Sequence, residues 1–515
     1  MLRRLLILLL LAATPAAAQT PHFAGGQLIV DGKPFLILGG ELGNSSASNR
    51  EWLKPHWPRL KAMHLNTVLA PVSWELIEPQ EGRFDFATVD WMIEDARGAD
   101  LRLVLLWFGA WKNSMSTYVP AWVKRDEKRF PRAMDAGGKP QEILSAFGTG
   151  TRNADARALA ALMRHLREVD GDRHTVILIQ VENEIGFLPS AREHGPIADA
   201  AFAEGVPGAL ASPHQSGRVP WSAAYGAAAE ETFTAEHYRR YTTFVAAAGK
   251  REYPLPMYVN GAQGRPGVKP GGYPSGGPLT HLFGTWGRDD DAIDFIAPDI
   301  YFPNFAEIVA GYAIPGNPLF VPEANNAGEP RAAANAWGVI AKHRGFGFSP
   351  FSIENIDPEG AARLGGLYAL LEGLTPEIVR AQAANRIRGF SPPVSFDNQA
   401  DETPQVATLG PYRFTVSFVD PWTPKDKQVP AEHGGAILWL GGEDYLVAGS
   451  GITVTAEPAD GKGRAGLDSV EEGTYVDGRW APGRRLNGDQ THQGRHIRLP
   501  PDAQGAQRVR LYRYG

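Results

Sequence analysis

The chain has 515 residues, of which 43% are hydrophobic and 21% are charged. This composition excludes a disordered or fibrous protein, and the length allows a barrel of roughly 250–400 residues together with a second domain. The formal net charge of −6 argues against nucleic acid or an anionic membrane as a partner, and the lack of cysteine excludes disulfides.

The first twenty residues have the pattern of a secretory signal peptide. Arg3 and Arg4 precede an apolar run from Leu5 to Ala13, and small residues follow at Ala16-Ala17-Ala18. We expect residues 1–18 to be removed on export to the periplasm or the medium, which brings the formal charge to −8. The apolar run is too short to span a bilayer, and no other stretch has 18 uninterrupted apolar residues.

Eight short segments rich in β-branched and aliphatic residues predict buried strands. Helical segments lie between several of them, such as Asp155–Val169 and Thr234–Ala248, and a last helix is predicted at Thr375–Arg388. The predicted strands, in chain order, are Phe35–Leu38, Asn66–Val72, Leu101–Leu106, Thr175–Val181, Leu255–Val259, Asp294–Tyr301, Leu319–Glu323 and Gly345–Phe351.

Eight strands separated by helices predict an α/β fold, a (β/α)8 barrel over residues 19–390. The long loops all follow strands, which is the face where such a barrel keeps its active site, whereas the segments that lead into strands are short. From residue 391 onward, short strands alternate with turns and no helical period is visible. We therefore predict an all-β sandwich over residues 391–515, attached through Ser391-Pro-Pro-Val-Ser.

Polar side chains gather where the predicted strands end. The fourth strand closes on Gln180-Val-Glu-Asn-Glu184, although buried strands do not usually end in two acids. An alternative is that Asn183 caps a helix that begins directly after the strand. The strand-end candidates are Glu41, Glu75, Asn113, Asn183, Glu184, Asn260, Tyr301, Glu323 and Glu354.

These candidates comprise acids, amides and an aromatic residue, without histidine, cysteine or a serine beside a base. The sequence has no zinc-protease, complete phosphate-loop or serine-elbow motif, so we predict neither a metal nor a cofactor. Two carboxyl groups suit glycoside hydrolysis, in which one protonates the leaving oxygen and the other attacks the anomeric carbon or activates water. Glu184 and Glu323 can face each other across the barrel mouth, with Glu354 as the alternative to Glu323.

Several motifs resemble those of one known enzyme family. Gln180–Gly186 resembles an Asn-Glu acid/base motif, Trp74–Phe86 resembles a second-strand signature, and Gly40-Glu41 fits the first strand. The family is glycoside hydrolase family 35, the β-galactosidases, and the resemblance extends over residues 27–355. The C-terminal segment is similar to the accessory β domain of the bacterial branch of this family.

The resemblance implies that Glu184 is the general acid/base and Glu323 the nucleophile. It also implies that Asn183 holds the sugar 2-hydroxyl and that Tyr301 orients the nucleophile. Further candidates for sugar contact are Ala110, Trp111, Asn113, Glu41 and Trp74. The two tryptophans are equally compatible with core packing. The chain departs from the animal enzymes at Pro71, where they have tyrosine, and at Gly-Ala-Trp-Lys112, where they have Cys-Ala-Glu.

We therefore expect an exo-acting, retaining β-galactosidase that removes terminal β-D-galactosyl residues from plant cell-wall oligosaccharides such as xyloglucan. The expected partner is this galactoside substrate, and the sequence makes no prediction of oligomeric state. Alternatives are a β-glucosidase, mannanase or endoglucanase of the same clan, or a non-catalytic carbohydrate-binding protein.

Overall fold

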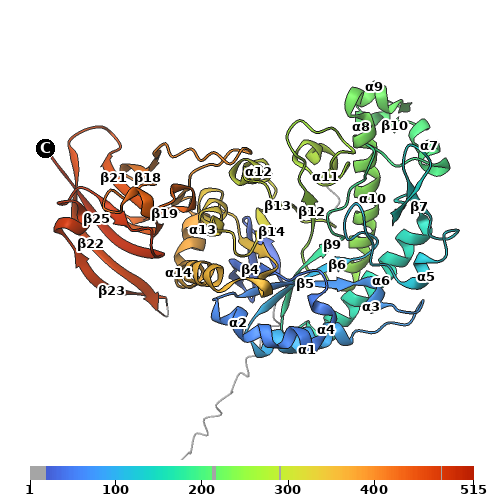
Figure 1. Cartoon of the computed structure of the whole chain (residues 1–515), viewed down its shortest axis with the longest axis horizontal. Helices are drawn as coiled ribbons and strands as arrows, with labels where there is room; N and C mark the ends of the chain where they lie inside the picture. The colour runs from blue at the N-terminus through green and yellow to red at the C-terminus, as the bar shows by residue number, and fades with distance from the viewer. Residues whose placement is uncertain (1–18, 212–215, 289–291, 477) are drawn as a thin grey trace, which may run out of the picture.

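A computed structural model describes residues 19–211, 216–288, 292–476 and 478–515. The predicted signal peptide lies outside the described residues. Figure 1 shows a barrel surrounded by helices, with the C-terminal β-sheets packed against one side of it. Within the ranges given, no helix has the length and apolar character needed to cross a membrane.

Eight parallel strands close into a barrel in the order β12-β13-β14-β15-β4-β5-β6-β9, which confirms the predicted fold class. Each predicted strand overlaps one of them, and almost every residue in them is buried because helices cover the outside and side chains fill the inside. The strands are β4 Ile37–Glu41, β5 Thr67–Ser73, β6 Arg102–Phe108, β9 Val176–Val181, β12 Met257–Ala262, β13 Phe295–Ile300, β14 Phe320–Asn326 and β15 Gly347–Phe351.

The helix that ends the barrel, α14, covers Pro358–Ala383 and so starts well before the predicted start at Thr375. Asp357 accepts a hydrogen bond from the backbone N–H of Gly360 at 2.8 Å, and Pro358 occupies the first helical position, which is a favourable helix start. The other helices around the barrel are α1 Arg50–Leu53, α2 Trp57–Ala62, α3 Trp74–Ile77, α4 Ala87–Gly98, α6 Thr149–Asp170, α10 Ala229–Glu252, α11 Phe283–Trp286, α12 Phe305–Tyr312 and α13 Ala332–Trp337.

The N-terminal strands close the barrel at the amino ends of its eight strands. They are β1 His22–Ala24, β2 Gln27–Val30 and β3 Lys33–Pro34. Leu28 and Val30 pack in one cluster with the barrel interior, and the ring centroids of Phe23 and Phe295 lie 5.5 Å apart. The open end is therefore the carboxyl end of the strands.

Two insertions cover part of that open end. After β6 come α5 Ala121–Lys124, β7 Arg132–Met134 and β8 Pro140–Leu144. After β9 come α7 Pro196–Ala203, β10 Val206–Pro207, α8 Gly208–Ala211, β11 Arg218–Val219 and α9 Trp221–Tyr225. The backbone N–H of His194 donates to the carbonyl of Met134 at 2.8 Å, and the hydroxyl of Ser145 donates to Glu193. These contacts join the two insertions.

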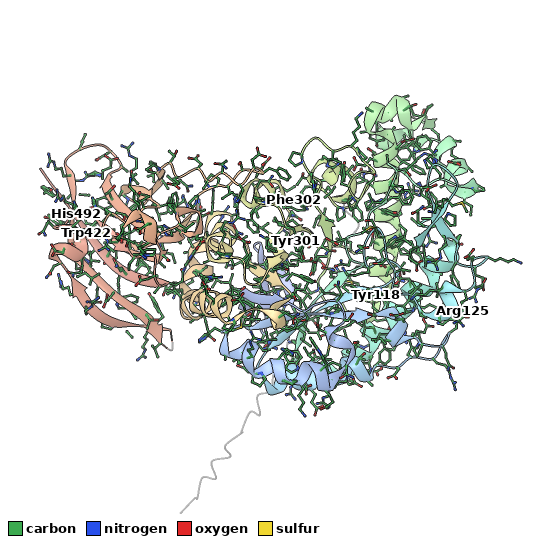
Figure 2. All side chains as sticks on the ribbon, viewed as in Figure 1. Tyr118, Arg125, Tyr301, Phe302, Trp422 and His492 are labelled. Carbon is green, nitrogen blue, oxygen red and sulfur yellow. The ribbon has the colours of Figure 1, made fainter. Side chains whose placement is uncertain are left out.

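The C-terminal residues form two antiparallel sheets with a core between them, which confirms the predicted all-β domain. One sheet contains β16 Ile387–Phe390, β19 Gly434–Gly441, β20 Asp444–Ser450, β25 Gly505–Tyr514, β22 Arg464–Val476 and β23 Arg479–Leu486. The other contains β17 Gln405–Leu409, β18 Tyr412–Ser417, β21 Ile452–Pro458 and β24 Ile497–Leu499. Figure 2 shows Trp422 and His492 at the far end of this sandwich and Tyr301 over the barrel.

The larger sheet belongs to two cores at once. Ile437 and Val447 pack inside the sandwich, whereas Leu438 and Ala448 pack into the cluster that contains the barrel helices. Side chains alternate between faces along a strand, so the same two strands serve both cores. The sandwich is thus joined to the barrel by continuous apolar packing.

Candidate active site

Strand β9 ends in a turn that presents its acids at the barrel mouth. Glu182 and Glu184 have φ angles of 61° and 44°, in the left-handed region that residues other than glycine seldom adopt. The backbone N–H of Glu184 donates to Oδ1 of Asn260 at 3.1 Å, and Nδ2 of Asn260 donates to Oδ1 of Asn183 at 3.0 Å. The next helix along the chain is α7, so Asn183 does not cap a helix here.

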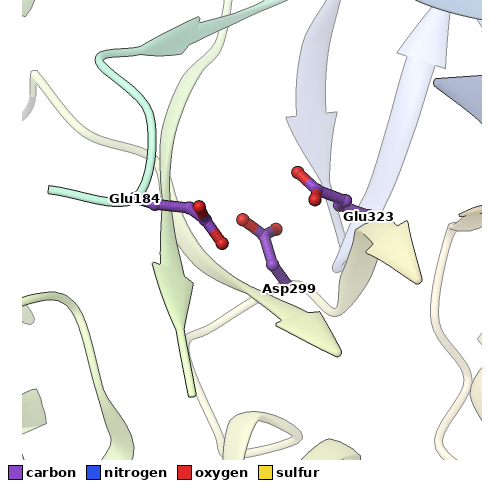
Figure 3. A group of neighbouring side chains, drawn as sticks. All are labelled: Glu184, Asp299 and Glu323. Carbon is purple, nitrogen blue, oxygen red and sulfur yellow. The ribbon is translucent and has the colours of Figure 1, made fainter. Parts of the chain in front are cut away.

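Three carboxyl groups meet at this mouth: Glu184 after β9, Asp299 in β13 and Glu323 in β14. Oxygen atoms of all three lie within 4.8 Å of one another, and Figure 3 shows Asp299 between the other two. Asp299 and Glu323 are paired residues of adjacent parallel strands, which explains their proximity. The structure thus brings Glu184 and Glu323 together and adds Asp299, which the sequence analysis missed.

Glu323 has the surroundings of an ionised carboxylate. The hydroxyl of Tyr301 donates to its Oε1, and Glu41 shares another hydrogen bond with it. Burial raises the pKa of Glu323, while the Lys112 charge and these hydrogen bonds lower it. The remaining rise is smaller than for Glu41 and Asp299, so Glu323 is the acid of this group that ionises most readily.

Glu184 has the surroundings of a proton donor. Burial, followed by the negative charge of Glu323, raises the pKa of Glu184 to about 7, against the lowering effect of Lys112 and of a hydrogen bond with Asp299. A carboxyl group with this pKa holds its proton at mildly acidic pH and can release it near neutrality. The two acids therefore have separated pKa values, as an acid and a nucleophile require.

The surroundings of Glu41 and Asp299 oppose their ionisation. Each is 1% exposed, and burial, together with the charge of Glu323, raises the pKa of each well above its ordinary value. Nδ2 of Asn260 donates to Oδ2 of Asp299 at 2.5 Å. Both groups therefore ionise less readily than Glu323, which is the favoured place for the negative charge.

A second pair of acids lies behind the first group. Oε2 of Glu182 accepts from the backbone N–H of Trp111 at 2.8 Å, and Asp155 accepts from the hydroxyl of Tyr241 at 2.9 Å. Glu182 and Asp155 also hydrogen-bond to each other, and burial raises the pKa of both. Together they hold the loop after β6 against the turn after β9.

Lys112, which was not among the predicted site residues, places an ammonium group in this site. Lys112 lies in the loop after β6 and is 7% exposed. Its charge lowers the pKa of four acids: Glu41, Glu184, Asp299 and Glu323. The signal available in the sequence is its place among strand-end residues, between Trp111 and Asn113.

The predicted sugar contacts have different positions. Asn183, 1% exposed, lies with the acids, as do Glu41 and Tyr301. Ala110, Trp111 and Trp74 are fully buried, so neither indole presents an open face. Oδ1 of Asn113 accepts hydrogen bonds from backbone N–H groups of its own loop.

Glu354, the alternative to Glu323, has another role in the structure. Its carboxylate accepts hydrogen bonds from the backbone N–H of Gly43 at 3.0 Å and from the hydroxyl of Ser46. These bonds fix the loop that follows β4. Glu323, not Glu354, faces Glu184.

Three carboxyl groups at such spacing can in principle bind a cation. Here Tyr301 and Asn260 already donate hydrogen bonds to Glu323 and Asp299, and the positive charge of Lys112 acts on the same oxygens. These contacts suit proton transfer among carboxyl groups better than metal ligation.

Comparisons with known proteins relate part of the chain to β-galactosidases. Residues 46–239 match the glycoside hydrolase 42 family model, described as beta-galactosidase, and residues 364–498 match the model of a domain of unknown function (DUF5597). A beta-galactosidase from Xanthomonas manihotis is 30% identical over 212 residues, 38% of this chain and 32% of the relative. Beta-galactosidase-1-like protein 3 of Homo sapiens is 27% identical over 191 residues, 35% of this chain and 26% of the relative.

The chain thus spans about a third or less of the length of these curated relatives. A solved beta-galactosidase from the psychrophilic Marinomonas ef1 is 11% identical, with a TM-score of 0.49 over 67% of this chain and 61% of that chain. The matched residues 46–239 include Glu184 and end before Glu323. The assignment to family 35 stays a prediction, and the conclusion that the comparisons carry is a relation to β-galactosidases over the first half of the barrel.

Proposed function

We propose that the protein is a retaining, exo-acting β-galactosidase that removes terminal non-reducing β-D-galactosyl residues. The observation that carries this proposal is the spacing of Glu184 and Glu323, whose carboxyl oxygens approach within 4.8 Å. Carboxyl groups about 5–5.5 Å apart are typical of retaining glycosidases, whereas inverting ones need about 6.5–9.5 Å to admit a water. The preference for galactose is supported by the motifs and by the related β-galactosidases.

In the first step, Glu323 attacks the anomeric carbon while Glu184 gives its proton to the departing glycosidic oxygen. The products are a galactosyl ester on Glu323 and a free aglycone. Forming the ester removes the negative charge of Glu323, which is the second largest cause of the raised pKa of Glu184. The pKa of Glu184 therefore falls at the stage when this residue has to act as a base.

In the second step, Glu184 takes a proton from water, and the resulting hydroxide attacks the anomeric carbon and displaces Glu323. Two inversions leave the released galactose in the β configuration. The returning charge on Glu323 raises the pKa of Glu184 again, so that it keeps the proton for the next cycle. The spacing of the two acids thus supplies both positioning and the alternation of their charges.

The burial of the site supports action on a terminal sugar. Glu323 and Asp299 are 5% and 1% exposed, while Glu184 is partly exposed at the end of β9. We infer that the natural substrates are galactosylated plant cell-wall oligosaccharides such as xyloglucan. In this proposal the protein belongs to the bacterial branch of family 35, is exported, and carries the sandwich as its accessory domain.

The test compares nitrophenyl β-galactoside with the glucoside and mannoside, and follows the first-formed anomer by proton NMR. We expect the galactoside to be preferred and β-galactose to appear first. Glu184→Gln and Glu323→Gln should each lose at least 100-fold in kcat on natural substrates, because the first removes the proposed acid/base and the second the proposed nucleophile. Glu354→Gln is the matched control, since this buried glutamate lies outside the three-acid group and should keep most activity.

Other results would change the conclusion. Preference for the glucoside or mannoside would assign another glycosidase activity of the same clan. Release of α-galactose first would establish inversion. Sugar binding without hydrolysis, equal in the wild type and Glu184→Gln, would indicate a carbohydrate-binding protein. Parallel assays on xyloglucan oligosaccharides, pectic galactan and lactose would then identify the aglycone.

A further inference from the structure

The three-acid site contains a lysine for which the proposed reaction gives no role. The backbone of Lys112 is fixed on both sides: its N–H donates to the carbonyl of Ser116 at 3.0 Å, and its carbonyl accepts from Nδ2 of Asn183 at 2.8 Å. The second bond connects Lys112 directly to the residue preceding Glu184. The backbone of Lys112 is therefore held in a fixed position relative to the turn that carries Glu184.

The side chain of Lys112 is largely buried, and its ammonium group has no direct partner among the described residues. Its residue is 7% exposed, and within the described part of the chain its Nζ makes neither a hydrogen bond nor an ion pair. The ring of Phe108 lies beneath it, with 5.1 Å between Nζ and the ring centroid. An ammonium group in such a place loses hydration, and nearby negative charge has to compensate for that loss.

The charge of Lys112 acts on acids that belong to four different strands. The positive charge of Lys112 lowers the pKa of each of these four acids, which are Glu41, Glu184, Asp299 and Glu323. The phenols of Tyr258 and Tyr301 face the same acids, and the Asp155–Glu182 pair lies behind Trp111. Among the described residues around the four acids, Lys112 is the cation that acts on all of them.

We propose that Lys112 is a positioning residue whose fixed positive charge is the counter-ion of the catalytic pair at both stages of the reaction. This inference rests on the proposed function. Before the attack, the ammonium charge balances Glu323. After the ester has formed, it balances Glu184. The site thus never holds an uncompensated buried carboxylate, which would be strongly unfavourable.

The proposal predicts a specific change in pH dependence. Lys112→Met keeps the length of the side chain and removes the charge, so the pKa values of Glu323 and Glu184 should both rise by roughly one unit or more. Both limbs of the pH profile of kcat/KM should move to higher pH, and kcat should fall at least tenfold at pH 5–6 with a smaller change in KM. Lys112→Arg keeps the charge and should restore the positions of both limbs. Lys61→Met, at an exposed lysine paired with Asp100, is the matched control.

A second measurement needs no substrate and so separates this inference from the proposed function. Buried acids whose folded pKa is raised destabilise the fold as pH rises from their unfolded pKa to their folded pKa. Removing Lys112 raises the folded pKa values further. Relative to the wild type, the unfolding temperature of Lys112→Met should therefore fall progressively as pH rises through the folded pKa values of Glu323 and Glu184, the latter about 7 in the wild type. Lys112→Arg and Lys61→Met should each show a constant offset.

The outcomes separate clearly. Shifted limbs that Lys112→Arg restores, together with a pH-dependent loss of stability in Lys112→Met, support the counter-ion. An unchanged pH profile with a raised KM would overturn it and make Lys112 a sugar contact. A constant offset in the unfolding temperature of Lys112→Met at all pH values would also overturn it. A wild type without glycosidase activity would refute the proposed function, while the unfolding series would still show whether Lys112 compensates the acids.

Discussion

The pKa of Glu184 determines how the reaction depends on pH above neutrality. With a pKa of about 7, the carboxyl group is about 90% protonated at pH 6 and about 10% protonated at pH 8. An ordinary glutamate, with a pKa of about 4.3, would be only about 2% protonated at pH 6. We therefore expect kcat/KM to fall about tenfold per pH unit above pH 7 to 8, as Glu184 loses its proton.

The variant Glu323→Gln tests the cause of this raised pKa. Burial remains in the variant, but the negative charge that is the second cause of the rise is removed. Two unit charges at 4.8 Å, the upper limit for the nearest oxygens of Glu184 and Glu323, interact by roughly 3 kcal/mol at an effective dielectric constant of about 20, which corresponds to about two pKa units. Because each charge is spread over two oxygens, we expect the pKa of Glu184 to fall by roughly one to two units.

The assay is a carbon-13 NMR titration of side-chain-labelled glutamate in the wild type and in Glu323→Gln, with Glu184→Gln to assign the signal. It measures protonation directly and so does not depend on the activity that Glu323→Gln loses. A Glu184 that still titrates near pH 7 in Glu323→Gln would refute the electrostatic coupling and leave burial as the cause. The alternation of acid and base roles would then need another explanation.

Three further substitutions test other parts of the structure. Tyr301→Phe removes the hydroxyl that donates to Glu323, and a hydrogen bond to a charged group contributes about 1.5–3 kcal/mol. Because Tyr301 is 43% exposed, we expect the lower end of this range, which is roughly a tenfold loss of kcat. The acidic limb of the pH profile should move to higher pH, because the lost bond lowers the pKa of Glu323. Glu182→Gln removes one acid of the buried pair with raised pKa, so the wild type should lose stability more steeply than the variant in thermal unfolding as pH rises above the ordinary pKa of glutamate. Leu438→Ala, between sandwich and barrel, should cost about 2–5 kcal/mol in denaturant unfolding, whereas Val406→Ala, at a side chain 59% exposed, should cost almost nothing; equal losses would contradict the shared core.

The barrel could be predicted because each of its strands is buried on both faces and ends in polar residues. The paired acids could be predicted for the same reason, since Glu184 and Glu323 stand at strand ends. Asp299 was missed because it lies inside an apolar run, and its role depends on pairing with Glu323 in the adjacent strand. The start of α14 was placed too late because Thr375-Pro376 resembles a helix start, whereas the apolar pattern continues from Pro358 through this proline.

The burial of the tryptophans after β5 and β6 has a consequence for how the acid/base is held. The loop after β6 is fastened to the turn after β9 by two bonds: Trp111 N–H to Glu182, and Asn183 Nδ2 to the carbonyl of Lys112. The turn needs this support because two of its residues have left-handed φ angles, each of which costs of order 1–3 kcal/mol. The segment from Gly109 to Lys112 therefore supports the position of Glu184 through its backbone, and supplies a positive charge through Lys112.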